Sequence, residues 1–458
     1  MRLTNVFSTV LLFMIFVIIT PNVMAETIKI SLWSRHDNSG PMRTTNIIEA
    51  SKQLNKKLKD SGDKRQVVVK VIAKHVRGYD IDAERVLERH KKGHTPDIIV
   101  AGHEWLGKFK KEGLIVDLES HILTNPDYYY DIIPILWDAV MVEGKRYGIP
   151  QDWEVRMFFL NNEMMRAAGI SDTFIESLPR KVDSGEFTMY DLCDLAARIK
   201  KKDPEKIGIL HRPNFGPEFQ MAMASFGNTF YNQELDKLVV SRSKLLTYYK
   251  WLHSCVKSEA IPAKMTRYSW RKFNAAFIAG SAFAKFHGIW NLDDQLEYLG
   301  IDREDKDSYN KRVTWINAPA GIKGGRSTNL SHPIVYTVGN TGNKETTKLA
   351  KELIALASQP GLNNNHAISS THLPINHGQW STIETMDSGW GLLEAKRLLK
   401  DTNLIFMPNH SSIGEYNRIT FENGVMEIEL NNKTPKDAME EVIDELQKQL
   451  NDDVMVVD

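Results

Sequence analysis

The chain has 458 residues and a formal net charge of zero, with 58 Lys and Arg residues against 58 Asp and Glu residues. Nucleic-acid-binding proteins are usually strongly basic, so this balance argues against a nucleic-acid partner. Hydrophobic residues make up 42% of the chain and charged residues 25%, as in a globular protein with a sizeable core. The length exceeds what one hydrophobic core usually serves, so we expect two lobes or domains.

The first 25 residues predict a cleavable secretory signal. Arg2 is followed by the apolar run VFSTVLLFMIFVII, a break at Pro21 and the small-residue ending VMA at residues 23–25. The residue after the expected cleavage point is Glu26 and not Cys, so no lipid anchor is indicated. No later run approaches the ~18 apolar residues that a membrane span needs. We therefore expect an exported, periplasmic protein without an anchor.

Strands and helices alternate from the start of the expected mature chain. Residues 28–33 (IKISLW) alternate like a strand, and residues 67–72 and 97–101 are further apolar runs of strand length. Between the first two strands, apolar residues recur at helical spacing in residues 47–58. Because strands joined by crossover helices are usually parallel and covered on both faces, the sequence predicts an α/β lobe whose ligand-bearing loops follow the strands.

Helices dominate the second half of the chain. Thr188 and Asp191 form a predicted capping box, which opens a helix whose apolar residues repeat at helical spacing up to Ile199. Thr434 followed by Pro435 predicts another helix start near the end of the chain. The sequence shows neither internal repeats nor a long flexible linker, so we expect short strands to join the lobes.

The two cysteines, Cys193 and Cys255, have two readings in an exported chain. An oxidising compartment allows a disulfide between them. Each also fits the apolar side of a helix, where a free thiol packs as a small hydrophobic group. No CxxC or Cys/His spacing indicates a metal, so we expect neither a metal nor another cofactor.

Motifs of common enzyme classes are absent from the sequence. It has no GxSxG, HExxH or Walker loop, and His103-Glu104 lacks the second histidine that zinc needs one helical turn later. Instead, aromatic and charged residues gather directly after expected strands. These clusters lie at residues 33–37, 103–105, 151–156 and 287–291. Clusters at the ends of α/β strands favour a binding cleft over a catalytic site.

Six groups of segments, in order along nearly the whole chain, carry a family pattern. The segments are PDIIVAGHEWLGKFKKEGLIVDL (96–118), GKRYGIPQDWEVRMFFLNNEMMRAAGI (144–170), FIAGSAFAKFHGIWN (277–291), APAGIKGG with SHPIVYTVGNTGNKE (318–345), HLPIN (372–376) and NNKTPKDAMEEVIDELQ (431–447). They resemble the segments of one family, the sugar-binding, maltose-binding-protein-like extracellular solute receptors of ABC importers. The chain departs from the family pattern at Leu160-Asn161-Asn162, where Tyr-Asn-Lys is usual, and at Phe283-Ala284, where Ala-Met is usual. The order and spacing of the segments make the resemblance specific.

The resemblance implies a type II periplasmic-binding-protein fold, with two α/β lobes around a cleft and three crossings between the lobes. The first lobe would comprise residues 26–150 and 333–373, and the second lobe residues 151–332 and 374–458. The crossings would lie near residues 151–155, 333–337 and 373–376. The resemblance also implies a monomer that encloses its ligand by hinge closure and then docks on the permease subunits of an ABC transporter.

The family's ligand positions, carried over by motif, predict a saccharide-binding site. They fall on Trp33, Arg35, His36, His103, Glu104, Trp105, Asp152, Trp153, Glu154, Phe215, Glu218, Trp290 and Tyr416. The chemistry of these residues agrees with the prediction, because sugar hydroxyls suit carboxylates and Arg or His donors. The C–H faces of a pyranose ring pack on tryptophan.

Two other classes of function remain open at this point. An exported carbohydrate-active enzyme could use Asp152 and Glu154 as paired carboxylates. A receptor on the same fold could bind another solute, such as a ferric ion held by neighbouring tyrosines at 128–130 or at 248–249. The sequence does not identify the ligand, because its Arg and His residues suit an acidic, phosphorylated or amino-polyol ligand as well as a neutral saccharide.

Overall fold

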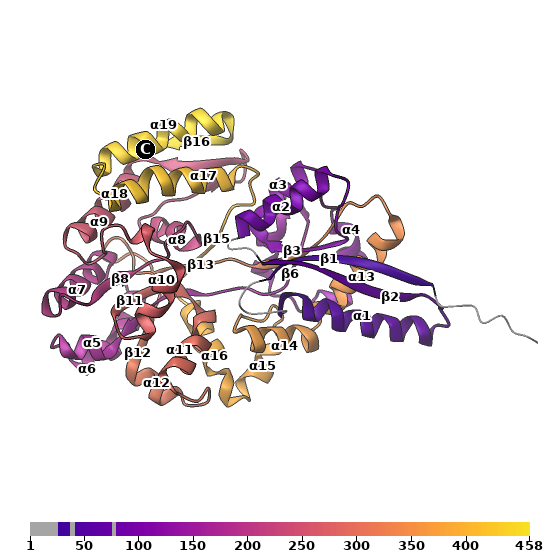
Figure 1. Cartoon of the computed structure of the whole chain (residues 1–458), viewed down its shortest axis with the longest axis horizontal. Coiled ribbons are helices and arrows are strands. Elements are labelled where there is room, and N and C mark those ends of the chain that lie inside the picture. Colours follow the sequence, from indigo (N-terminus) through magenta and orange to yellow (C-terminus); the bar gives the residue numbers. More distant parts are fainter. Residues whose placement is uncertain (1–25, 37–41, 76–78) are drawn as a thin grey trace, which may run out of the picture.

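A computed structural model describes residues 26–36, 42–75 and 79–458 of the chain. The expected signal at residues 1–25 lies outside this part. Figure 1 shows two α/β lobes side by side. We call the part built on the five-stranded sheet the first lobe and the part built on the four-stranded sheet the second lobe. No helix within the described ranges is long and apolar enough to cross a membrane.

The first lobe has a mixed sheet with the strand order β2-β1-β3-β14-β6. Its strands are β1 (Thr27–His36), β2 (Gln66–His75), β3 (Ile98–Gly102), β6 (Ile149–Pro150) and β14 (Ile334–Val338). The first three strands are parallel to one another, as the sequence predicts, whereas β14 runs antiparallel to β3 and to β6. A strand from late in the chain therefore lies beside β3.

Helices cover both faces of this sheet. Side chains alternate between the two faces along each strand, so one strand contributes residues to the cores on both sides. Ile30 and Leu32 pack in the main core with α1 (Met42–Asp60) and α13 (Lys344–Ala357). Trp33 and Ile99 point the other way and pack with α2 (Tyr79–Lys91) and α3 (Leu106–Lys111). The remaining elements of this lobe are η1 (His103–Trp105), α4 (Glu119–Thr124), η2 (Pro126–Tyr128), η3 (Pro134–Val140), β4 (Met141–Val142), β5 (Lys145–Arg146) and α14 (Pro360–Ser370).

The second lobe is built on a sheet with the strand order β12-β7-β11-β8. Its strands are β7 (Arg156–Asn161), β8 (Ile207–Leu210), β11 (Ala282–Gly288) and β12 (Val313–Ile316). The helices around it are α5 (Asn162–Ala167), α6 (Asp172–Asp183), α7 (Met189–Lys202), η4 (Met265–Arg267), α10 (Trp270–Ile278), η5 (Ile289–Asn291), α11 (Leu292–Leu299) and α12 (Lys306–Arg312). The predicted capping box of Thr188 and Asp191 is present at the start of α7.

Two smaller sheets and a group of helices complete the second lobe. One sheet joins β13 (Thr328–Ser331) to β15 (Asn403–Phe406), and the other has the order β16-β10-β9. The remaining elements are α8 (Pro217–Ser225), β9 (Tyr231–Asn232), β10 (Lys237–Ser241), α9 (Arg242–Lys257), α15 (Gln379–Glu384), η6 (Asp387–Gly389), α16 (Trp390–Leu398), α17 (Ile413–Ile419), a π-helix at Thr420–Met426, α18 (Glu427–Glu429), α19 (Pro435–Leu450), η8 (Asn451–Asp453) and β16 (Val454–Val457).

Three links pass between the lobes, and two of them lie directly side by side. Residues 151–155 connect β6 to β7, and Trp153 in this link pairs antiparallel with Leu373, which follows α14. The third link is His332 and Pro333, between β13 and β14, because residues 334–338 already belong to the first sheet. The predicted lobe boundaries stay a prediction.

A disulfide joins Cys193 of α7 to Cys255 of α9, with their Cα atoms 5.6 Å apart. Both residues are buried on the inward faces of their helices. The apolar helix positions that the sequence indicates are therefore compatible with the disulfide.

Candidate functional site

A network of buried ion pairs begins in the link at residues 151–155. Asp152 pairs with Arg43 from the first turn of α1, and its Oδ2 also lies 2.7 Å from Nε2 of His366 in α14. Glu154 pairs with Arg156, with 2.6 Å between its Oε2 and Nη1 of the arginine. Both carboxylates point into protein rather than solvent, since Asp152 is 0% and Glu154 3% exposed.

The neighbouring cations keep these two carboxyl groups ionised. Burial alone would raise the pKa of Asp152, but the nearby Arg43 and His372 hold it well below its ordinary value. Burial would likewise raise the pKa of Glu154, but Arg156 and the nearby His372 lower it to about 2. Both groups are therefore carboxylates at neutral pH and act as hydrogen-bond acceptors.

The network continues to Glu218 in the first turn of α8. Its Oε2 accepts a hydrogen bond from Nη1 of Arg212 at 3.1 Å, and its Oε1 lies 3.2 Å from Nδ1 of His287. Nε of Arg156 lies 3.7 Å from the same Oε1, so Arg156 connects Glu218 to Glu154. Burial would raise the pKa of Glu218, but Arg212 and the other donors hold it well below its ordinary value.

Trp290 provides the aromatic surface of this network. The Arg156 guanidinium lies 5.2 Å from the centroid of the indole ring, and the His372 ring stacks on the indole at 5.7 Å with an interplanar angle of 7°. Residue 288 is glycine, and a Cβ there would overlap the ring, so Gly288 leaves room for the indole. The arrangement combines a flat apolar ring with charged hydrogen-bonding groups around it, a combination that suits a polyhydroxylated ring.

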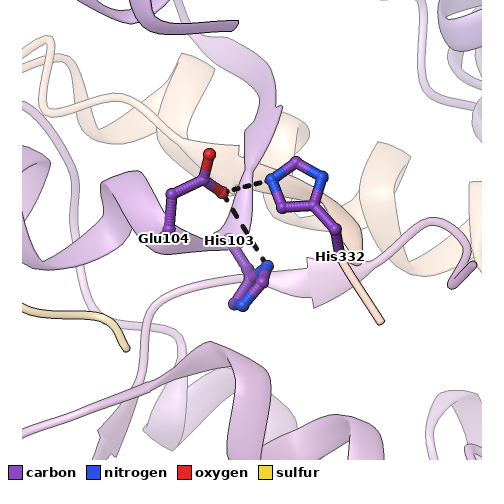
Figure 2. A group of neighbouring side chains, drawn as sticks. All are labelled: His103, Glu104 and His332. Carbon is purple, nitrogen blue, oxygen red and sulfur yellow. Dashed lines mark hydrogen bonds and ion pairs between the residues drawn. The ribbon is translucent and has the colours of Figure 1, made fainter. Parts of the chain in front are cut away.

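A second cluster consists of His103, Glu104 and His332 (Figure 2). Oε2 of Glu104 lies 2.7 Å from Nε2 of His332 and 3.8 Å from Nδ1 of His103. Burial lowers the pKa of His103 to about 4, so its ring is neutral at neutral pH. The Glu104 carboxylate folds back over Gly102, so a side chain at residue 102 would displace this carboxylate from its present position.

The antiparallel pairing of β3 and β14 brings these three residues together. Ile334 pairs with Gly102, and the same register, extended past the ends of the strands, sets Pro333 opposite His103 and His332 opposite Glu104. The backbone N–H of His103 indeed donates to the Pro333 carbonyl at 3.1 Å. The cluster therefore sits where the first sheet meets the link at residues 332–333.

Other residues predicted for the site pack mainly against protein. Trp33 donates its indole N–H to Asp82, and Trp153 donates its indole N–H to the Pro374 carbonyl at 2.9 Å. Tyr416 lies in the second lobe's core and donates to the Val239 carbonyl, whereas the half-buried Phe215 packs against Phe219. Their role in binding stays a prediction.

The remaining predicted residues are Trp105, Arg35 and His36. The indole N–H of buried Trp105 has no hydrogen-bond partner in the described part of the chain. Its ring faces Gly414 of α17 in the second lobe, which makes Trp105 a candidate contact on the first-lobe side. Arg35 and His36 end β1, but their side chains lie outside the described residues.

Sequence reasoning missed most of the cationic partners in the network. The missed residues are Arg43, Arg212, His332, His366 and His372, whereas Arg156 and His287 belong to the clusters at residues 151–156 and 287–291 that the sequence indicates. His332 and His372 lie in two of the family-like segments, SHPIVYTVGNTGNKE and HLPIN, but neither segment marks its histidine as a ligand position. Arg43 and His366 belong to none of the quoted segments and become visible only in the folded chain.

The tyrosine pairs suggested for a ferric ion lie away from the network. Tyr248 and Tyr249 are buried core residues of α9, and the Tyr249 hydroxyl donates to the Thr420 carbonyl at 3.0 Å. Burial raises the pKa of both phenols, which opposes the phenolate form that iron would need. Tyr129 is likewise buried, with its pKa raised by burial, and its hydroxyl lies 3.0 Å from Nε2 of His121.

Comparisons with known proteins give a family and a fold. A family model described as bacterial extracellular solute-binding protein matches residues 84–363. The maltotriose-binding protein of Pyrococcus abyssi is 21% identical over 211 residues, which are 46% of this chain and 41% of that protein. The match therefore spans less than half of that relative's length.

Two solved structures are similar over nearly their whole length. The GacH receptor of Streptomyces glaucescens, solved unliganded and with acarbose, gives a TM-score of 0.71 at 15% identity, covering 92% of this chain and 98% of that chain. A substrate-binding protein of Listeria monocytogenes in complex with cycloalternan gives a TM-score of 0.69 at 16% identity. This match covers 93% of this chain and 99% of that chain. At these identities the likeness concerns the fold, and it confirms the predicted two-lobed α/β fold of type II.

Proposed function

The chain belongs to the bacterial extracellular solute-binding proteins, and on this basis we propose that it captures a saccharide for an ABC importer. The observation that carries the proposal is the buried network at the lobe junction. It combines the carboxylates of Asp152, Glu154 and Glu218 with the face of Trp290. Hydroxyl groups of a sugar would donate to these carboxylates, while one ring face packs on the indole.

The names of similar proteins support this ligand class. The relatives include a maltotriose-binding protein, and the similar structures were solved with acarbose and with cycloalternan. A saccharide of one or more glucose-like rings is therefore the first class of ligand to test. The same proposal includes export to the periplasm, delivery to the permease subunits of a transporter, and a monomeric state.

The ionisation of the carboxylates favours binding over glycoside hydrolysis. A glycosidase of the usual kind needs one carboxyl group that is protonated at working pH, with a raised pKa. Both Asp152 and Glu154 instead have pKa values below their ordinary range, because Arg43 and Arg156 face them. We therefore expect no cleavage of any saccharide that binds.

The test begins with mass spectrometry of whatever small molecule copurifies with the exported protein, followed by calorimetry with that compound and with maltodextrins. Wild-type protein should bind at least one saccharide, and Trp290→Ala should bind it up to about tenfold more weakly, since an aromatic face contributes ~0.5–1.5 kcal/mol beyond area burial. Chromatography of the incubated saccharide should show no product.

Trp137→Ala is the matched control for this experiment. Trp137 is also half-buried and also carries a guanidinium over its ring, with Arg146 at 5.0 Å, but it lies in the first lobe away from the network. Its removal should leave saccharide affinity unchanged. Absence of saccharide binding, equal affinity of wild type and Trp290→Ala, or sustained product formation would each contradict the proposal.

A further inference from the structure

The cluster of His103, Glu104 and His332 has the composition of a metal site. One atom from each residue lies within 4.8 Å of one atom from each of the other two, and all three residues are buried. Figure 2 shows both imidazole rings turned toward the same carboxylate oxygen of Glu104. Two ring nitrogens and one carboxylate oxygen therefore lie within 4.8 Å of one another at one point of the lobe junction.

The hydrogen bonds of His103 favour a cation at that point. Its Nε2 lies 3.1 Å from the Met407 carbonyl oxygen, and its Nδ1 lies 3.3 Å from the Pro333 carbonyl oxygen. Carbonyl oxygens only accept hydrogen bonds, and a neutral imidazole carries one proton. If Nε2 donates to Met407, the lone pair of Nδ1 faces two oxygens, those of Pro333 and Glu104.

Metal-binding histidines usually have this arrangement. The ring nitrogen that does not bind the metal donates its N–H to a backbone carbonyl or a carboxylate, which fixes the tautomer and the ring orientation. In this chain the Met407 carbonyl would fix His103 in the tautomer whose Nδ1 is unprotonated. Without a cation, the Nδ1 lone pair of His103 faces the oxygens of Pro333 and Glu104. A cation held by Nδ1 would replace this unfavourable contact with a coordinate bond.

We propose that His103, Glu104 and His332 bind one divalent transition-metal ion. Two imidazole nitrogens and one carboxylate oxygen are the donor set of many zinc sites, in which a fourth position remains for water or another ligand. Mg²⁺ and Ca²⁺ prefer all-oxygen sets of six or more donors. The site should therefore take Zn²⁺, or Co²⁺ in its place, in preference to Mg²⁺ and Ca²⁺.

The position of the site gives the metal an effect on the lobes. His103 and Glu104 follow β3 in the first lobe, His332 lies in the link between β13 and β14, and the Met407 carbonyl comes from the segment that follows β15. A metal would join the first two of these segments, and the hydrogen bond from His103 to the Met407 carbonyl would connect the third to them. It would stabilise the arrangement in which the segment after β15 lies against the first lobe.

The experiment uses the full exported chain, freed of metal with a chelator and titrated with Zn²⁺ by calorimetry in the absence of any saccharide. We expect one equivalent of bound Zn²⁺ and a higher unfolding temperature in its presence. Glu104→Gln and His332→Ala should each weaken Zn²⁺ binding by at least about tenfold, since loss of a residue that only orients a ligand already costs about 10–100-fold. Zinc X-ray absorption should show two histidine nitrogens at about 2.0–2.1 Å.

His94→Ala is the matched control, because His94 is exposed and lies outside the cluster. It should bind Zn²⁺ like the wild type. No Zn²⁺ binding by the wild type, equal binding by Glu104→Gln and His332→Ala, or tighter binding of Ca²⁺ than of Zn²⁺ would overturn the proposal. Since no saccharide is present, these outcomes are independent of the proposed transport function.

Discussion

His287 is a buried histidine that should make stability depend on pH. Its Nδ1 lies 3.2 Å from the Glu218 carboxylate, and its ring packs edge-on against Trp290. Burial lowers the pKa of His287 to about 4, because it outweighs the opposing hydrogen bond and charge of Glu218. The positive charges of Lys285 and Arg212 lower it further.

The sign of the pH effect follows from this lowered pKa. An unfolded histidine takes up a proton near pH 6.5, whereas folded His287 stays neutral down to about pH 4. Its contribution to stability is therefore fully present above pH 6.5 and is lost as the pH falls toward 4. Between pH 7 and pH 5 we expect His287 to account for a loss of about 1–2 kcal/mol in the free energy of unfolding.

The effect is measured by unfolding the protein with urea at pH 7 and at pH 5 and monitoring the unfolding by tryptophan fluorescence. His287→Asn keeps a donor near Glu218 but does not titrate, so its loss of stability between pH 7 and pH 5 should be smaller than that of the wild type. The exposed His94→Asn should behave like the wild type. An equal loss in His287→Asn and wild type would mean that His287 does not titrate as described.

At the residue scale, the sequence predicts the carboxylates of the network better than the Arg and His side chains that pair with them. Asp152 and Glu154 follow the recognisable segment Gly-Ile-Pro, whose last two residues form β6, so their place in a cleft is predictable. Arg43 and His366 lie 109 and 214 residues from Asp152 along the chain, and no local pattern indicates that they contact it. Such pairs are set by the packing of helices on the sheet, which the sequence pattern does not specify.

At the element scale, the disulfide between α7 and α9 should stabilise the second lobe. It closes a loop whose ends are 62 residues apart in sequence, and the chain-entropy model gives about 4 kcal/mol for a loop of this length. We expect Cys193→Ala with Cys255→Ala to lower the free energy of unfolding by roughly 2–4 kcal/mol under oxidising conditions.

Guanidinium unfolding of the wild type and of the double variant, each with and without a reducing agent, checks this expectation. Reduction should destabilise the wild type and leave the double variant unchanged. A thiol assay on denatured, unreduced wild-type protein should find no free cysteine. Free thiols, or equal stability of the oxidised wild type and the variant, would contradict a stabilising disulfide.

Elements whose signals are local agree best between sequence and structure. The capping box of Thr188 and Asp191 and the start of α19 at Pro435 need only neighbouring residues, and both are present as predicted. The pairing of β14 with β3 is different, because these strands are more than 200 residues apart and antiparallel in an otherwise crossover-linked sheet. The cluster of His103, Glu104 and His332 depends on that pairing, so sequence alone could not place His332.

At the scale of the whole molecule, the two lobes also touch at a distance from the charge network. Between β15 and α17, the Asn409 side chain donates to the first-lobe carbonyls of Ala139 at 2.7 Å and Met141 at 3.1 Å. Gly107 lies so close to the Asn409 carbonyl that a Cβ would overlap it. These contacts hold the two lobes together in the described arrangement and involve no group of the charge network.

If the lobes close around a ligand, the contacts of Asn409 should affect binding indirectly. A ligand that contacts both lobes binds the closed state preferentially, so any contact that favours closure also raises apparent affinity. Asn409→Ala removes two lobe–lobe hydrogen bonds, each worth about 0.5–1.5 kcal/mol. We therefore expect its affinity for the saccharide selected by calorimetry to fall by roughly tenfold, although no group of the charge network is changed.

Small-angle scattering with and without that saccharide separates closure from a rigid site. The wild type should become more compact on binding. Asn409→Ala should reach the same compact state, but only at a higher saccharide concentration. The reason is that the variant disfavours closure without altering the contacts between the closed lobes and the ligand. A rigid receptor would instead show one radius throughout and no effect of Asn409→Ala on affinity. Either result would contradict hinge closure.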